Sequence, residues 1–155
     1  MTYRIRGLDP APFRHLYGLD DAALAAEQVV RMKVTAKPDA PCRVELVDVD
    51  PGETVLLVNY EHLPVATPYR SAHAIFVREG AEDAAEFVDT IPEPLAIRLL
   101  SVRAFDADGM MTDADVFEGS ELDRRIEEFF ADPRVAYLHA HNAGRGCFAA
   151  RIDRA

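Results

Sequence analysis

The sequence VAYLHAHNAGRGCFAARID, Val135 to Asp153, has alternating side chains on both sides of a glycine-bearing turn, which predicts a β-hairpin. Residues opposite one another in an antiparallel pair point to the same side of the sheet. A turn of three residues (AGR) or five residues (NAGRG) keeps the polar and apolar sets apart, whereas an even turn mixes them. An odd turn therefore predicts one face with Tyr137, His139, His141, Cys147 and Arg151, and a core face with Leu138, Phe148 and Ile152.

Helical patterns precede this hairpin and also occur near the N-terminus. Asp9 can cap a first N-terminal helix and Asp20 or Asp21 a second one within residues 9–32, and the prolines of TAKPDAP end the second. The segment GSELDRRIEEFFAD, residues 119–132, predicts another helix with Ser120 as its N-cap. Its apolar face would be formed by Leu122, Ile126, Phe129 and Phe130.

Strand patterns occupy the middle of the chain. Residues 42–49 (CRVELVDV) alternate, residues 54–60 (TVLLVNY) are largely apolar, and the DPGE turn between them predicts a hairpin. Further along, we expect a proline-bearing loop at 61–73, a strand at 74–79, a short helix or turn at 80–88, an extended segment at 90–94, a strand at 95–106 and a solvated turn in the acidic run 106–118.

The order of these elements predicts the fold class. Helices are followed by strands, a helix and a final pair of strands, and the connections between strands are too short for helical crossovers. The sequence therefore predicts an α+β fold that forms a single domain over residues 1–155. Its sheet would be mainly antiparallel, with N-terminal helices and one helix before the last hairpin.

The charge balance excludes several classes of partner. The net charge is −10, and a nucleic-acid-binding or anionic-membrane-binding protein needs clustered lysine and arginine. The N-terminal residues lack the apolar run of a secretory signal, and no apolar run approaches the length of a membrane span. We therefore expect a cytoplasmic protein without nucleic-acid or membrane partners. Cys42 and Cys147 are expected to be free thiols.

The His139-x-His141 pair indicates metal binding as one possible function. Two histidines spaced by two on a strand point the same way, and a third ligand could come from His62, His73 or Cys147. The spacing does not fix that third ligand, and the competing interpretation is a pair of partly exposed histidines on a solvated face. From the sequence, no residue is assigned to a metal and no cofactor is named.

Nucleophilic chemistry and anion binding are also compatible with the residues around this hairpin. Cys147 would lie across the hairpin from His141, as a thiol beside a base, although a buried structural cysteine is the competing interpretation. Arg145 lies between two glycines, and Arg70 lies in the proline-bearing loop with Tyr60, His62 and Tyr69. Both arginines could hold an anion. In the competing interpretation, Arg145 is only a turn residue and Arg70 pairs with an acidic neighbour.

Several segments resemble one bacterial family of proteins, the domain-of-unknown-function family 1203. The segments are PCRVEL, GETVLLVNYEHLPVATPYRSAHAIFVRE, RAFDADGMM and HNAGRGCFAARID, and the similarity runs from about Tyr3 to Arg154. The resemblance implies a single-domain bacterial cytoplasmic protein, and it carries no activity, cofactor or catalytic residue. The residues that match its signature are Asn59, Tyr60, His62, Pro68, Tyr69, Arg70, His139, His141, Asn142, Gly146 and Cys147.

The preferred hypothesis is a pocket for a small anionic molecule between the 59–73 loop and the 139–147 hairpin tip. Binding would use Asn59, Tyr60, Tyr69, Arg70, His139, Asn142 and Arg145, and any catalysis would use His141, His62 and Cys147, with a histidine as general base. Whether a reaction is catalysed stays open. A protein-interaction module or homodimer without chemistry is the second hypothesis, and a metal protein is the third.

Overall fold

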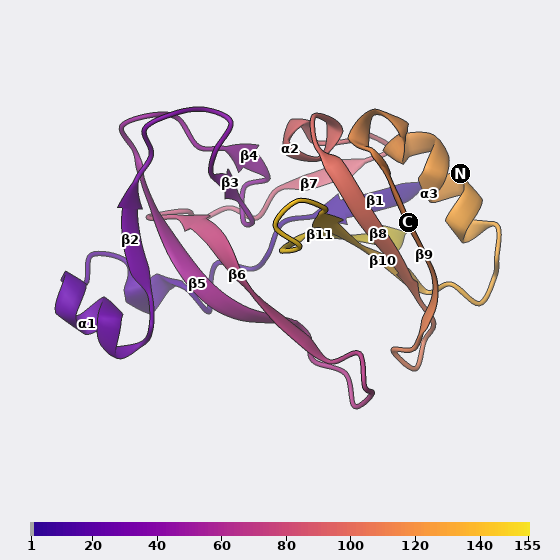
Figure 1. Ribbon diagram of the computed structural model, residues 1–155, viewed down its shortest axis with the longest axis horizontal. Helices are drawn as coiled ribbons and strands as arrows, with labels where there is room; N and C mark the ends of the chain where they lie inside the picture. Colours follow the sequence, from indigo (N-terminus) through magenta and orange to yellow (C-terminus); the bar gives the residue numbers. More distant parts are fainter. Residues whose placement is uncertain (1) are drawn as a thin grey trace.

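A computed structural model describes residues 2–155 and shows two β-sheets side by side, with short helices at their edges (Figure 1). Nearly all strand pairs are antiparallel; β3 and β6 pair in parallel. The α+β prediction is confirmed. No helix in the described part of the chain is long and apolar enough to cross a membrane.

The six-stranded sheet, sheet A, contains the first and the last strand of the described chain. Its strand order is β7-β1-β11-β10-β8-β9. The helix α3 covers one face, where Leu122, Ile126, Phe129 and Phe130 are buried as predicted. The elements on this side are β1 (Tyr3–Arg6), β7 (Glu86–Val88), α2 (Glu93–Ala96), β8 (Leu99–Phe105), β9 (Met111–Glu118), η2 (Gly119–Glu121), α3 (Leu122–Phe130), β10 (Tyr137–Asn142) and β11 (Phe148–Arg154).

The five-stranded sheet, sheet B, is built on one long hairpin, β5–β6. Its strand order is β2-β5-β6-β3-β4, and its core includes Leu24, Val55, Leu56, Ile75 and Val77. The elements are η1 (Arg14–Leu16), α1 (Asp21–Ala26), β2 (Val30–Lys33), β3 (Pro41–Cys42), β4 (Val47–Asp48), β5 (Thr54–Leu63) and β6 (Ser71–Arg78).

The β5–β6 hairpin reaches from sheet B to sheet A, and its tip lies beside the β8–β9 turn (Figure 1). The Thr67 hydroxyl donates a hydrogen bond to the carbonyl of Gly109 at 3.0 Å. Near the tip, Leu63 of β5 is buried with Phe105 and Tyr137 of sheet A. The hairpin therefore holds its side chains against one face of β10, the face opposite α3.

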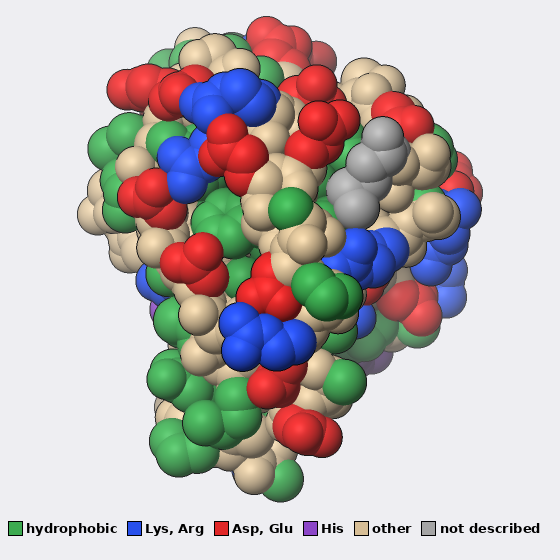
Figure 2. Space-filling view, turned by 90° about the vertical axis from the view of Figure 1, so that its right-hand side faces the viewer, with side chains coloured by type: hydrophobic (Ala, Val, Ile, Leu, Met, Phe, Trp, Pro, Cys, Tyr) green, Lys and Arg blue, Asp and Glu red, His purple; other side chains and the backbone are tan. Residues whose placement is uncertain are grey.

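Opposite charges are interspersed on the side of the molecule formed by α3 and β9 (Figure 2). Arg124 pairs with Glu128 on α3, and Arg125 of α3 lies 2.6 Å from Asp115 of β9. Exposed pairs of this kind contribute about 0–1 kcal/mol each. This face therefore has no broad patch of one sign.

The second predicted N-terminal helix is too long. The helix α1 ends at Ala26, Gln28 has a positive φ of 59°, and Val30–Lys33 form strand β2 along β5. The apolar spacing within 20–32 fits a helix, but pairing with the edge of β5 takes over where β-branched Val29 and Val30 begin. The first predicted helix is reduced to the three-residue turn η1.

The predicted hairpin of 42–49 with 54–60 is also wrong. Leu46 has a positive φ of 52° and its N–H bonds to the carbonyl of Cys42, so the chain turns between the two-residue strands β3 and β4. Strand β5 pairs with β2 and β6 instead. The alternating pattern could not predict this turn. That pattern places Arg43 on the exposed face of a strand, whereas its side chain is buried in the structure.

Other boundaries move because strands extend into expected loops. The loop predicted at 61–73 shortens to 64–70, since β5 runs to Leu63 and β6 starts at Ser71. The acidic run 106–118 mostly forms the edge strand β9, part of 80–88 forms β7, and Glu93–Ala96 are helical instead of extended or strand. Ser120 does not cap α3, which follows directly from the 3-10 turn η2.

The last hairpin forms as predicted, with one correction at its turn. Five residues, 143–147, connect β10 to β11, and Gly146 has the left-handed φ of +79°. A β-bulge after Ala140 pairs His141 with Phe148, so Phe148 turns away from Leu138 and Ile152. An extra residue on one strand reverses the facing of the next one. Phe148 therefore joins the sheet B core, on the side of the histidines.

Candidate functional site

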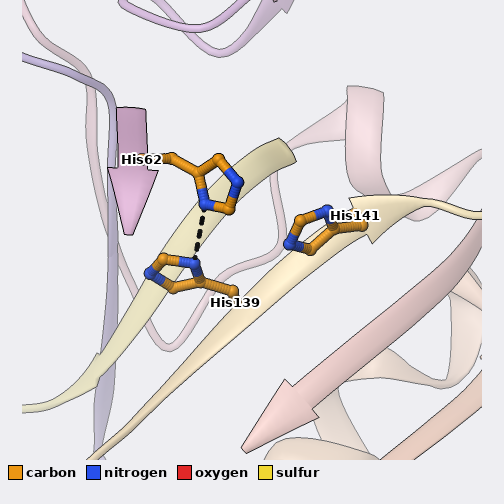
Figure 3. A group of neighbouring side chains, drawn as sticks. All are labelled: His62, His139 and His141. Atoms are coloured by element: carbon orange, nitrogen blue, oxygen red, sulfur yellow. Dashed lines mark hydrogen bonds between the residues drawn. The ribbon is translucent and has the colours of Figure 1, made fainter. Parts of the chain in front are cut away.

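Four of the five histidines gather where the β5–β6 hairpin lies against sheet A. His62 comes from β5 and His73 from β6, whereas His139 and His141 come from β10. His139 and His141 share a face because they are two apart on one strand. Figure 3 shows that His62 and His139 point toward each other, with His141 beside them.

The distances in this cluster suit a shared cation. The Nδ1 atoms of His62 and His139 are 3.3 Å apart. His62, His139 and His141 each offer one ring nitrogen, and these atoms all lie within 4.8 Å of one another. Nitrogens around a tetrahedral zinc ion, with bonds of about 2.0–2.1 Å, are about 3.4 Å apart. One pair already has this spacing, and the third nitrogen lies within 4.8 Å of both.

Two of the remaining ring nitrogens have partners that orient the rings. His141 Nδ1 lies 3.0 Å from the carbonyl oxygen of Gly146, which can only accept, so His141 Nε2 keeps its lone pair. His62 Nε2 lies 2.6 Å from His73 Nδ1. Histidines that bind metals usually donate the second ring N–H to such a partner, which fixes the tautomer and the ring orientation.

Burial keeps these imidazoles neutral at pH 7. The exposed fractions are 1% for both His139 and His141 and 9% for His62. Burial is the main cause that lowers the pKa of His139 to about 2, of His141 to about 3 and of His62 to about 4. The neutral imidazole is the form that binds a metal. The competing interpretation of partly exposed histidines on a solvated face is therefore wrong.

The cationic side chain of Arg103 lies at the edge of the cluster beside His141. Arg103 of β8 is paired in register with His139, and its Nη1 lies 3.4 Å from His141 Nε2. No ion pair of Arg103 is present within residues 2–155. A cation at His141 Nε2 has to displace this contact, and the guanidinium would then be free for an anionic ligand of that cation.

Cys147 lies beside an arginine rather than beside His141. His141 pairs with Phe148 in the hairpin, which corrects the expected position across from Cys147. The Sγ atom lies 3.1 Å from Nη2 of the buried Arg43 and 3.7 Å from Nδ2 of Asn142. Both cysteines are unpaired, as predicted.

A cavity of about 700 Å³ adjoins the cluster. It lies between the face of sheet B and the β10–β11 turn, and Asn142, Arg145 and Cys147 line it. His73 also lines this cavity, and through its contact with His62 it connects the cavity to the histidine cluster.

The remaining predicted binding residues lie elsewhere. Arg70 forms an ion pair with Glu61 at 3.0 Å and is not part of the cavity lining. Tyr60 packs against Phe13, with ring centroids 5.6 Å apart, and Tyr69 packs against Phe105. Asn59 is an exposed residue of β5. The structure thus gathers His62, His139 and His141 in one cluster and Asn142, Arg145 and Cys147 in the adjoining cavity.

Sequence patterns assign no specific role to three polar residues near the site, and they misplace Phe148. Arg43 and Arg103 lie within predicted strands, and their sequence context does not distinguish them from ordinary surface arginines. His73 is predicted only as an optional third ligand. Phe148 stacks on His62 with centroids 4.8 Å apart, and only the bulge places it there.

Comparison with known proteins identifies a family but no activity. Neither the search of curated proteins nor the search of solved structures gave a match. Residues 39–154 match the model of a family described as "Protein of unknown function (DUF1203)". Those residues include both strands of the long hairpin, the last hairpin and all four histidines of the cluster. The chain belongs to the DUF1203 family.

Proposed function

We propose that this protein binds one divalent transition-metal ion through His62, His139 and His141. The observation that carries the proposal is the convergence of three ring nitrogens, from strands of two different sheets, within 4.8 Å. Nitrogen ligands of this kind suit zinc, copper, iron and nickel. Three histidines also leave a fourth position for water or a ligand, the pattern of catalytic rather than structural zinc sites.

The contacts around the cluster support this proposal. His62 Nδ1, His139 Nδ1 and His141 Nε2 would be the ligand atoms, because His73 and the Gly146 carbonyl hold the other nitrogens of His62 and His141. A metal ion would also resolve the contact between the two Nδ1 atoms, where one must carry a proton when no cation lies between them. Arg103 would then face the fourth position and favour an anionic ligand there.

Zinc titration of untagged, metal-stripped protein tests the proposal. We expect calorimetry to show one bound Zn²⁺ per chain, and His62→Gln, His139→Gln and His141→Gln should each weaken binding by at least about tenfold. His73→Gln should have a smaller effect, because it removes only the partner that orients His62. Arg103→Met should tighten binding, because it removes a positive charge beside a ligand atom.

The fifth histidine provides a matched control. His15 lies outside the cluster, with its Nε2 2.9 Å from Glu27, so His15→Gln should leave zinc affinity unchanged. Circular dichroism of each variant shows whether it has kept the fold. Zinc binding that survives in all three cluster variants, or that disappears with His15→Gln, would show that the metal binds elsewhere.

A further inference from the structure

The cavity beside the histidine cluster is cationic although the chain is acidic. Its lining includes Lys33, Arg43, Arg98 and Arg145, and Asp39 is the only carboxylate among the described residues that line it. The whole chain has 27 acidic and 17 basic residues. Basic residues are thus concentrated at a cavity whose volume, about 700 Å³, is in the usual range of small-molecule sites.

Two exposed cations of this lining have no counter-ion among residues 2–155. Arg98 is neutralised by both carboxylate oxygens of Asp48, at 3.0 and 2.7 Å. In the part of the chain that the structure describes, neither Lys33 nor Arg145 has an ion pair. Both are exposed at the cavity, so their charged ends are available to a ligand.

Arg43 adds a buried charge to the same wall. It is 2% exposed, and its guanidinium donates to the carbonyl oxygens of Phe148 and Pro41 and to the sulfur of Cys147. These three partners include no carboxylate. Buried charges in proteins are usually paired, so a guanidinium held only by carbonyl and sulfur atoms creates a positive potential that an anion in the cavity would neutralise.

The rest of the lining is largely apolar. Val55, Leu57 and Phe76 contribute the floor from strands β5 and β6, and Val34 and Pro41 contribute a side wall. A fully polar anion would leave this surface exposed to water. A ligand with an apolar body and one anionic group would cover it and gain about 25 cal/mol for each Å² of apolar surface buried.

We infer that this cavity binds a small amphipathic anion, with a carboxylate or phosphate group near Lys33, Arg43 and Arg145 and an apolar body against Leu57 and Phe76. The inference stands on the cavity alone and does not require a metal in the histidine cluster. It also differs from a site built on Arg70, which pairs with Glu61 outside the cavity.

Three probes with the same eight-carbon chain test this inference by calorimetry on metal-free protein. Octanoate and octyl phosphate carry the two candidate head groups, and octanol is their neutral counterpart. We expect at least one of the two anions to bind about tenfold more tightly than octanol, since a hydrogen bond to a charged group is worth more than one unit of log affinity. The tighter of the two anions identifies the head group.

Variants locate the bound probe. Because Arg43 is buried, the charge is removed at the exposed positions, as Lys33→Met and Arg145→Met. The double variant should bind the anion about tenfold more weakly and octanol unchanged. The control is Arg134→Met, because the Arg134 side chain is 78% exposed, pairs with Asp132 and does not line the cavity.

Three results would overturn the inference: octanol as tight as both anions, no binding of either anion at millimolar concentration, or full affinity in the double variant. Zinc titration of the double variant separates the two proposals. Retained zinc binding with lost anion binding shows a separate anion site. If His141→Gln loses zinc binding but still binds the anion, the anion site does not depend on the metal site.

Discussion

Lowering the pH of the metal-free protein from 7 to 5 is expected to reduce its free energy of unfolding by roughly 6 kcal/mol. Burial lowers the pKa of His139 to about 2, of His141 to about 3 and of His62 to about 4, below the ordinary value of 6.5. Below pH 6.5 the unfolded chain therefore binds protons that the folded protein excludes. Stability is fully present above pH 6.5 and is lost as the pH falls toward the folded pKa values.

Urea denaturation at pH 7, 6 and 5 measures this effect. Each of these three histidines should contribute about 1.4 kcal/mol per pH unit below 6.5. His62→Gln, His139→Gln and His141→Gln should each make the pH dependence shallower by roughly a third. A urea midpoint that stays constant or rises from pH 7 to 5 would contradict the buried neutral cluster.

Replacing Gly7 by alanine should strongly destabilise the fold. Gly7 lies where the chain leaves β1 of sheet A, and a Cβ atom there would lie 1.8 Å from the carbonyl oxygen of Val44 and 3.1 Å from the backbone N of Ala85. These are backbone atoms, and they are hydrogen-bonded to each other at 2.9 Å, so neither can move alone. We expect a loss of about 3 kcal/mol or more, the upper end of overpacking effects.

This substitution also tests how the site is assembled. Gly7 joins sheet A to the segment that leads into sheet B, and the cluster needs His62 from one sheet and His139 from the other. Gly7→Ala should therefore lose both thermal stability and zinc binding. Gly144 is the matched control, since a Cβ atom there meets nothing within 4 Å. Similar melting temperatures for the two variants would show that the junction adapts more freely than its contacts indicate.

The parts of the fold that the sequence predicts are those with strong local patterns. The amphipathic stretch around Ile126 and Phe129 forms α3, and the odd turn with Gly146 forms the last hairpin. The errors fall where tertiary pairing overrides the local pattern. Val30 leaves a helical pattern to pair with β5, and Leu46 adopts a positive φ inside an alternating segment.

The candidate site was predictable only in part for the same reason. Because His139 and His141 are two residues apart on one strand, the sequence places them on the same face. No sequence pattern shows which distant strand supplies the third histidine. His62 is 77 residues from His139, and it arrives through the packing of the long hairpin on sheet A. The charge at the cavity depends on Arg43, whose burial follows from the unpredicted turn at Leu46.

An anomalous difference map at the zinc absorption edge, from a crystal of untagged protein grown with Zn²⁺, tests the central claim most directly. We expect one peak within about 2.0–2.3 Å of His62 Nδ1, His139 Nδ1 and His141 Nε2. A well-ordered map in which these three imidazoles have no peak between them and keep their contacts, with His62 Nδ1 still beside His139 Nδ1 and zinc only at surface carboxylates, would contradict the proposed metal site.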